Sequence, residues 1–159
     1  MENCTVAGNE VAGSLPKDSA ALYCTSWQVL FYNNIFVGNR ETRKDGGKRT
    51  SVKLDFDGKN GYKYVSNITD DVAIGGSANK SVGNRVASAE SLFADFARGD
   101  FTPLPGCAAY NAGTTAGLAL APSVDLAGNP RIFDATGKAR IDIGCYECQR
   151  RPGMTLVIW

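Results

Sequence analysis

Three ionisable side chains alternate along one short segment and can act together on a charged ligand. In SVKLDFD, residues 51–57, Lys53, Asp55 and Asp57 share one face of an expected strand, and apolar residues occupy the other face. Side chains two apart on a strand are about 6 to 7 Å from each other, so a lysine and two carboxylates line one polar surface. We interpret this trio as a candidate substrate-binding groove. The alternative is a solvated strand face of mixed charge.

Tyr62 and Tyr64 form a second candidate substrate-binding pair. They follow the turn signal GKNG at residues 58–61 and share one face of the expected return strand of a hairpin near residues 51–66. Aromatic rings exposed on such a hairpin can stack on sugar rings. The alternative is that both rings pack in the core.

The chain contains no histidine, which excludes Ser-His-Asp and Cys-His nucleophilic sites and imidazole metal sites. Its five cysteines, at positions 4, 24, 107, 145 and 148, include one close pair in CYEC. A second pair that would complete four zinc ligands is missing. The sequence therefore predicts no catalytic residue, no metal and no other cofactor.

Charge and hydrophobicity indicate one globular domain. Of the 159 residues, 43% are hydrophobic, and 17 Lys and Arg residues balance 16 Asp and Glu residues to a net charge of +1. This balance does not favour nucleic acid as a partner. The apolar runs are all shorter than the roughly 20 residues that span a bilayer, so we expect no membrane insertion.

A repeated string supplies the elements that would position these residues. NCTVAGN at 3–9 aligns with NNIFVGN at 33–39 at an offset of 30 residues, and VSNITDD at 65–71 is a weaker third copy. Such repeats predict stacked units, because one unit cannot bury its apolar face without a neighbour. Asn3, Asn33 and Asn39 fall at the turns of this unit, where we expect structural roles.

The remaining segments read as short elements between turns. RETRKDGGKRT at 40–50 is a loop by composition, and residues 87–97 predict a short helix. Residues 123–133 and 135–147, separated by turn residues, predict two more paired strands.

Three motifs in the second half of the chain resemble a known family. SLFADFARGDFTPLPGCAAYNAGT at 91–114 is followed by DLAGNPRI at 125–132 and RIDIGCYE at 140–147, in the order of that family's motifs. The family is the choice-of-anchor Q type C-terminal region, which closes right-handed parallel β-helix proteins similar to pectate lyases. Cys107 and Cys145 depart from its pattern, because they stand where members usually carry serine and alanine.

The resemblance implies stacked coils of three short strands, with asparagine ladders inside the turns. NCTVAGN and NNIFVGN would then be equivalent corners of successive coils. It also implies that Asp125, Arg131, Asp142 and Glu147, which lie on the matched motifs, form a structural ion-pair set holding two hairpin strands over the last coil. A secreted or cell-surface location in a bacterium follows from the same resemblance.

We therefore predict an all-β fold, a short right-handed parallel β-helix. Residues 1–86 would form two to three coils with the hairpin inserted near 51–66, and residues 87–159 would form a C-terminal cap. The expected function is non-catalytic: the segment stacks on upstream coils of a longer chain and covers the hydrophobic end of a protein that binds or processes polysaccharide. The alternatives are a polysaccharide lyase or glycoside hydrolase that uses the Lys53 groove, and a carbohydrate-binding module that uses the tyrosine pair. An open N-terminal edge further predicts self-association.

Overall fold

The structure, a computed structural model, describes most of the repeat and most of the C-terminal region. The described residues are 1–12, 30–42, 48–50, 63–70, 81–119, 123–132 and 140–149. Lys53, Asp55, Asp57 and Tyr62 lie outside them, so the predicted substrate groove and half of the predicted tyrosine pair stay predictions.

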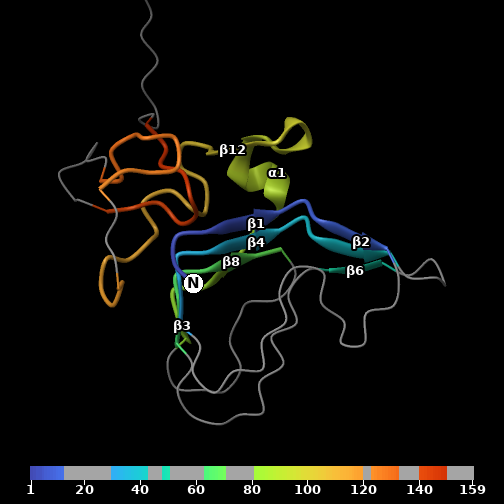
Figure 1. The fold of residues 1–159 in the computed structure, drawn as a ribbon, viewed down its shortest axis with the longest axis horizontal. Coiled ribbons are helices and arrows are strands. Elements are labelled where there is room, and N and C mark those ends of the chain that lie inside the picture. The colour runs from blue at the N-terminus through green and yellow to red at the C-terminus, as the bar shows by residue number, and fades with distance from the viewer. Residues whose placement is uncertain are drawn as a thin grey trace, which may run out of the picture.

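Short strands in three sheets form the described part of the first 86 residues (Figure 1). The central sheet contains, in order, β1 (Thr5–Ala7), β4 (Ile35–Val37), β8 (Ile68–Thr69) and β10 (Arg85–Val86). The second sheet contains β3 (Leu30–Tyr32), β7 (Lys63–Val65) and β9 (Ser81–Val82), and the third contains β2 (Glu10–Ala12), β5 (Arg40–Thr42) and β6 (Lys48–Thr50). All neighbours in the first two sheets are parallel, so the all-β expectation agrees with the structure.

The register of these sheets follows the sequence repeat. Thr5 pairs with Ile35 and Ala7 with Val37, which confirms the alignment of NCTVAGN with NNIFVGN at an offset of 30 residues. Ile35 pairs with Ile68 at an offset of 33, and Ile68 with Arg85 at 17. We call each passage of the chain through the sheets a rung: 2–12, 30–42, 63–70 and 81–86.

Asparagine side chains link the rungs at the turn between the second sheet and the central sheet. Asn34 Nδ2 donates to Asn67 Oδ1, and Asn67 Nδ2 donates to Asn84 Oδ1, each at 3.0 Å. The same two oxygens accept the backbone N–H groups of Asn34 (3.0 Å) and Asn67 (2.9 Å). Cys4 occupies this position in the first rung, and its N–H donates to Asn34 Oδ1 at 3.1 Å. This ladder supplies acceptors for buried turn amides that have no strand opposite them.

The asparagines predicted to be structural link rungs at both ends of the central strands: Asn3 and Asn33 come just before the ladder position, and Asn39 follows β4. Asn9 Nδ2 donates to Asn39 Oδ1 at 2.8 Å, and Asn39 Nδ2 donates to Val6 O at 2.8 Å. Asn3 and Asn33 adopt φ of 51° and 56°, a left-handed conformation that asparagine tolerates better than most residues. Asn33 Nδ2 donates to Asn3 Oδ1 at 3.0 Å, so this pair also links two rungs.

Aromatic rings fill the concave side of the bend between the second sheet and the central sheet. Phe31 and Tyr64 stack with centroids 5.6 Å apart, and Phe36 meets Phe31 edge-on at 6.1 Å. Tyr64 is 6% exposed. The prediction that it is exposed for sugar stacking is therefore wrong, because its strand belongs to a rung.

The hairpin lies at a different place from the predicted one. Residues 63–65, expected as the return strand of a hairpin near 51–66, form β7 and pair in parallel with β3 and β9. Residues 51–62 lie outside the described residues. The segment 40–50, expected as a loop, supplies the antiparallel strands β5 and β6, with Arg40 opposite Thr50.

The C-terminal region begins with a compact unit of α1 (Ala89–Leu92), β11 (Phe93–Asp95), the 3-10 helix η1 (Phe96–Arg98) and β12 (Asp100–Pro103). Ser88 caps α1, because its side-chain oxygen accepts the Ser91 N–H at 3.3 Å. The helix predicted over 87–97 is limited to four residues, since the backbone is extended from Phe93, which pairs with Pro103 in an antiparallel hairpin.

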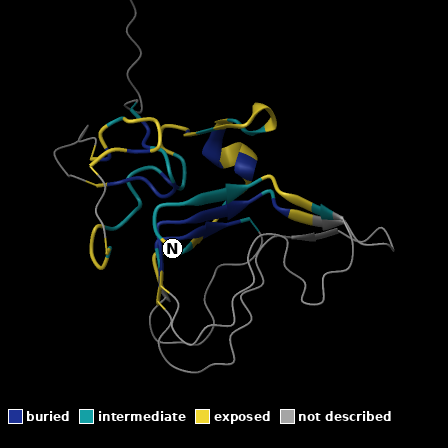
Figure 2. Cartoon of the chain, viewed as in Figure 1, coloured by how far each residue is buried: buried dark blue, intermediate teal, exposed yellow. Residues whose placement is uncertain are grey.

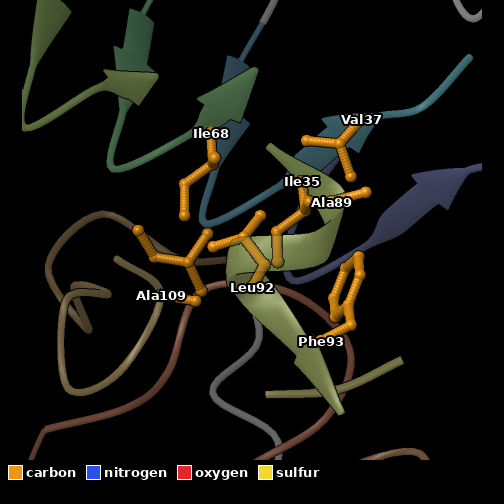
Figure 3. Packing of buried hydrophobic residues seen from close by; sticks show 8 residues of the cluster. Ile35, Val37, Ile68, Ala89, Leu92, Phe93 and Ala109 are labelled. Atoms are coloured by element: carbon orange, nitrogen blue, oxygen red, sulfur yellow. The ribbon is translucent and has the colours of Figure 1, made fainter. Parts of the chain in front are cut away.

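This unit covers the outer face of the central sheet, opposite the aromatic rings. Ala89, Leu92 and Phe93 form one cluster with side chains of the sheet and of the C-terminal loops (Figure 3). The other buried members of the cluster are Ile35, Val37, Ile68, Ala109 and Ile143. Both faces of β4 are therefore buried, as the dark blue of that strand shows (Figure 2).

The described part of the C-terminal region packs on the side of the rungs, and in the last rung Val82 and Val86 are 65% and 51% exposed. One prediction about this region is wrong for the described residues. Residues 123–132 and 140–149 do not form paired strands; one antiparallel bridge joins Val124 to Pro130. Side-chain hydrogen bonds replace strand pairing there.

Asn67→Ala tests the ladder. The substitution removes the acceptor for two buried donors of Asn34, and we expect it to lower the free energy of unfolding by about 2 to 3 kcal/mol. Asn9→Ala is the control. Because Asn9 is exposed, this substitution should lower the free energy of unfolding by only about 0.5 kcal/mol. Urea unfolding measures both; equal losses would contradict the role of the buried ladder.

Gly38→Ala tests the contact between the C-terminal unit and the sheet. Gly38 has φ of 65°, and a Cβ there would lie 2.4 Å from Phe96 Cζ. Gly99 has φ of 78° with nothing within 4 Å of a Cβ. We expect Gly99→Ala to cost about 1 kcal/mol from backbone strain, and Gly38→Ala to cost about 2 kcal/mol more from the clash. Equal unfolding midpoints would show that Phe96 does not lie on the sheet.

Candidate functional site: the buried carboxylate cluster

Four buried polar residues come together in the loops of the C-terminal region: Asp125, Arg131, Asp142 and Glu147. Asp125 and Arg131 flank the turn that the bridge between Val124 and Pro130 closes. Asp142 and Glu147 lie on the last described segment. We call these four residues the carboxylate cluster.

Asp125 organises the turn around it and ties that turn to the last segment. Its carboxylate accepts the backbone N–H groups of Ala127 (2.9 Å), Asn129 (2.8 Å) and Glu147 (2.9 Å), and the Asn129 side-chain amide at 3.3 Å. Burial by itself would raise the pKa of Asp125, but these donors outweigh burial and lower it. Asp125 therefore remains ionised and holds the turn closed.

Asp142 joins two loops through backbone amides. Its Oδ1 accepts the Asn111 N–H at 2.6 Å, and its Oδ2 accepts the Cys148 N–H at 2.7 Å. Burial raises the pKa of Asp142, although these two amides and the nearby Arg131 partly oppose the rise. Asn111 is held at φ of 49°, so the bond from its amide stabilises an uncommon turn conformation.

Glu147 is the most perturbed acid of the cluster. Both of its carboxylate oxygens accept the Asp142 N–H, at 3.1 and 3.0 Å, and the residue is 3% exposed. Burial, with a further contribution from the charge of Asp142, raises its pKa to about 8. Glu147 is therefore mostly protonated at neutral pH.

Arg131 does not form the predicted ion pairs. Its Nη2 donates to Gly144 O, and no ion pair joins it to any carboxylate of the cluster. Its Nε and Nη1 are buried without a hydrogen-bond partner in the described structure. The predicted ion-pair set is thus wrong in its contacts: the carboxylates bind backbone N–H groups instead, because irregular loops leave many amides without a strand partner.

The cluster sits over the first two rungs and not over the last one. Gly144 N donates to Asn33 O at 2.9 Å, and Cys145 N donates to Thr5 Oγ1 at 3.2 Å. Asn33 also exchanges two hydrogen bonds with the backbone of Thr114, each of 2.8 Å. Asn33 therefore links the repeat to the C-terminal loops, a role that the repeat alone did not reveal.

A cleft of about 620 Å³ opens between the cluster and the first rung. Arg131 and Asp125 line it from the C-terminal loops. The rest of its wall is Glu2, Asn3, Cys4, Thr5, Val124, Leu126 and Cys145. The cleft was not evident from the sequence, because its two walls are more than a hundred residues apart in the chain.

Chemically, the hydrogen bonds of the cluster organise the backbone of the loops. The oxygens of Asp125, Asp142 and Glu147 accept N–H groups from within the loops. Within the described residues, no group of three Cys, Asp or Glu side chains is arranged to hold a metal ion. The longest described helix has four residues, so none there is long enough to cross a membrane.

The family resemblance led us to expect an asparagine ladder inside the turns, but sequence reasoning missed the residues that form it. Asn34, Asn67 and Asn84 carry it, whereas the repeat pointed to Asn3, Asn33 and Asn39. The string SN at 66–67, which follows NN at 33–34, was the available signal. The step of 17 residues to Asn84 hid the last member.

Comparisons with protein-family models, with curated proteins and with solved structures found no match. The family resemblance of the three motifs therefore stays a prediction.

The raised pKa of Glu147 predicts how stability changes with pH. Because the folded chain binds this proton more tightly than the unfolded chain, stability is greatest below the ordinary pKa of 4.5 and falls as pH rises towards about 8. Asp142, whose pKa is also raised, contributes with the same sign. We expect Glu147→Gln, a neutral side chain of the same shape, to flatten the fall between pH 5 and about 8.

Urea unfolding across this range measures the effect. Glu90→Gln is the matched control, because Glu90 is exposed on α1 and its substitution should leave the slope unchanged. A slope that persists in Glu147→Gln would mean that another group carries the pH dependence.

Proposed function

We propose that this chain forms part of a right-handed parallel β-helix and that its C-terminal region is a non-catalytic scaffold for it. Parallel sheets, rungs of 30 and 33 residues and stacked asparagines support the fold. The three C-terminal motifs support a secreted or cell-surface protein that binds or processes polysaccharide. In this proposal the region covers the side of the helix, and further rungs complete the protein.

The burial of the outer face of β4 and β8 carries the proposal. Ile35, Val37 and Ile68 point away from the interior of the rungs, and each is at most 1% exposed. Without α1 and β11 these side chains would form an exposed apolar stripe, a surface that promotes association. Burying Leu92 against the stripe contributes about 1.5 to 3 kcal/mol to the free energy of unfolding. The contact therefore stabilises the rungs and also shields their apolar stripe from solvent.

The lyase or hydrolase reading and the sugar-binding reading depend on residues outside the described part of the chain. No contact among the described residues favours either one, and Tyr64 is buried. Loss of activity or of sugar affinity in variants of those residues would favour one of them instead.

Two variants, Leu92→Ala and Lys53→Ala, distinguish a scaffold role of this chain from a catalytic role. We expect Leu92→Ala to lower the free energy of unfolding by about 3 kcal/mol, because it leaves a cavity under α1. Any activity of the intact protein on a panel of uronate-containing and neutral polysaccharides should fall only in proportion to the unfolded fraction. Lys53→Ala should keep both stability and activity.

Circular dichroism measures folding, product release from the panel measures activity, and calorimetric titration with the same sugars measures affinity. Activity lost in Lys53→Ala while the fold persists would overturn the scaffold role in favour of catalysis. If the protein binds a sugar without cleaving it, and Tyr62→Ala abolishes this binding, the chain is a sugar-binding module instead.

A further inference from the structure

A buried arginine with unused hydrogen-bond donors lies at the wall of the cleft beside the carboxylate cluster. Arg131 lines the cleft although the residue is 1% exposed, and its Nε and Nη1 have no hydrogen-bond partner in the described structure. Buried polar groups in native proteins are nearly always hydrogen-bonded, so a buried guanidinium with unused donors calls for a further partner. An anionic oxygen is the strongest acceptor for such donors.

The acids of the cleft are already engaged. Both oxygens of Asp125 accept N–H groups of its own turn or of the last segment, and Glu2 Oε1 accepts the Ala119 N–H at 2.9 Å. Neither acid is within ion-pair distance of Arg131. The guanidinium thus remains the group of the cleft whose pairing is incomplete.

The mouth of the cleft is apolar. Val124 is 49% exposed and Leu126 is 71% exposed, and both line the cleft. Exposed apolar side chains next to a buried cation fit a ligand with one anionic end and one apolar end. The volume of about 620 Å³ is in the range of small-molecule sites.

We propose that this cleft binds a small organic monocarboxylate, whose carboxylate accepts hydrogen bonds from Arg131 and whose apolar body lies on Val124 and Leu126. The site joins the first rung to the C-terminal loops, so an occupied cleft stabilises the contact between them. The inference is independent of the polysaccharide in the proposed function, because it uses residues that the sugar-binding readings do not.

Calorimetric titration with 4-methylpentanoate and with its amide tests the proposal. The two probes have the same shape, but the amide has no charge. We expect saturable binding of the acid and at least about tenfold weaker binding of the amide, because a charge-assisted bond is lost. Equal affinities, or no saturable binding of the acid, would overturn the proposal.

Two variants locate the site. Leu126→Ser, at an exposed position that should not affect folding, should weaken 4-methylpentanoate about three- to tenfold and leave acetate unchanged. Arg131→Met should abolish binding of 4-methylpentanoate and of acetate. If this variant does not fold, the titration of Leu126→Ser and the comparison of acid with amide test the site on folded protein. Undiminished binding in Leu126→Ser would place the ligand elsewhere and refute the assignment.

Discussion

Hydrogen bonding of turn amides by stacked asparagines is the constraint on which the rest of this structure depends. The chain bends between two sheets in every rung, and at the bend the backbone N–H groups of Asn34 and Asn67 donate to side-chain oxygens instead of to the backbone of the next rung. Asn34, Asn67 and Asn84 supply the missing acceptors and link each rung to the next. Because a slip of one residue would move each amide to the other face of the strand, the ladder holds the register as well.

The register in turn creates the surface on which the C-terminal region folds. With Ile35 beside Ile68, the outer face of the central sheet is apolar, and α1 and β11 pack on it. Gly38 has no side chain to keep Phe96 away from the sheet. The interior rings and the outer cluster therefore bury the same strand from two sides, which explains why every residue of β4 is buried.

Buried carboxylates take over where regular pairing ends. Where the structure describes the loops after residue 104, one bridge between Val124 and Pro130 is the only strand pairing, and Asp125, Asp142 and Glu147 accept the amides that a sheet would otherwise satisfy. This use of acids has a cost, because burying several carboxylates raises the pKa of Glu147 to about 8. It also leaves Arg131 buried beside the cleft with two nitrogen atoms that have no acceptor in the described structure.

The sequence by itself determined the elements that depend on local pattern. The match of NCTVAGN with NNIFVGN predicted the strands, their turns and the offset of 30 residues, because stacking requires equivalent side chains at equivalent positions. It could not separate an exposed Tyr64 from a buried one, since alternation along a strand shows which residues share a face but not what covers that face. The tertiary structure alone decided that the C-terminal region covers the side of the rungs, that Asp125 and Glu147 bind amides instead of Arg131, and that Thr5 meets Cys145. Each of these contacts joins segments far apart in the chain, and their energies depend on burial and on competing partners that no local pattern records.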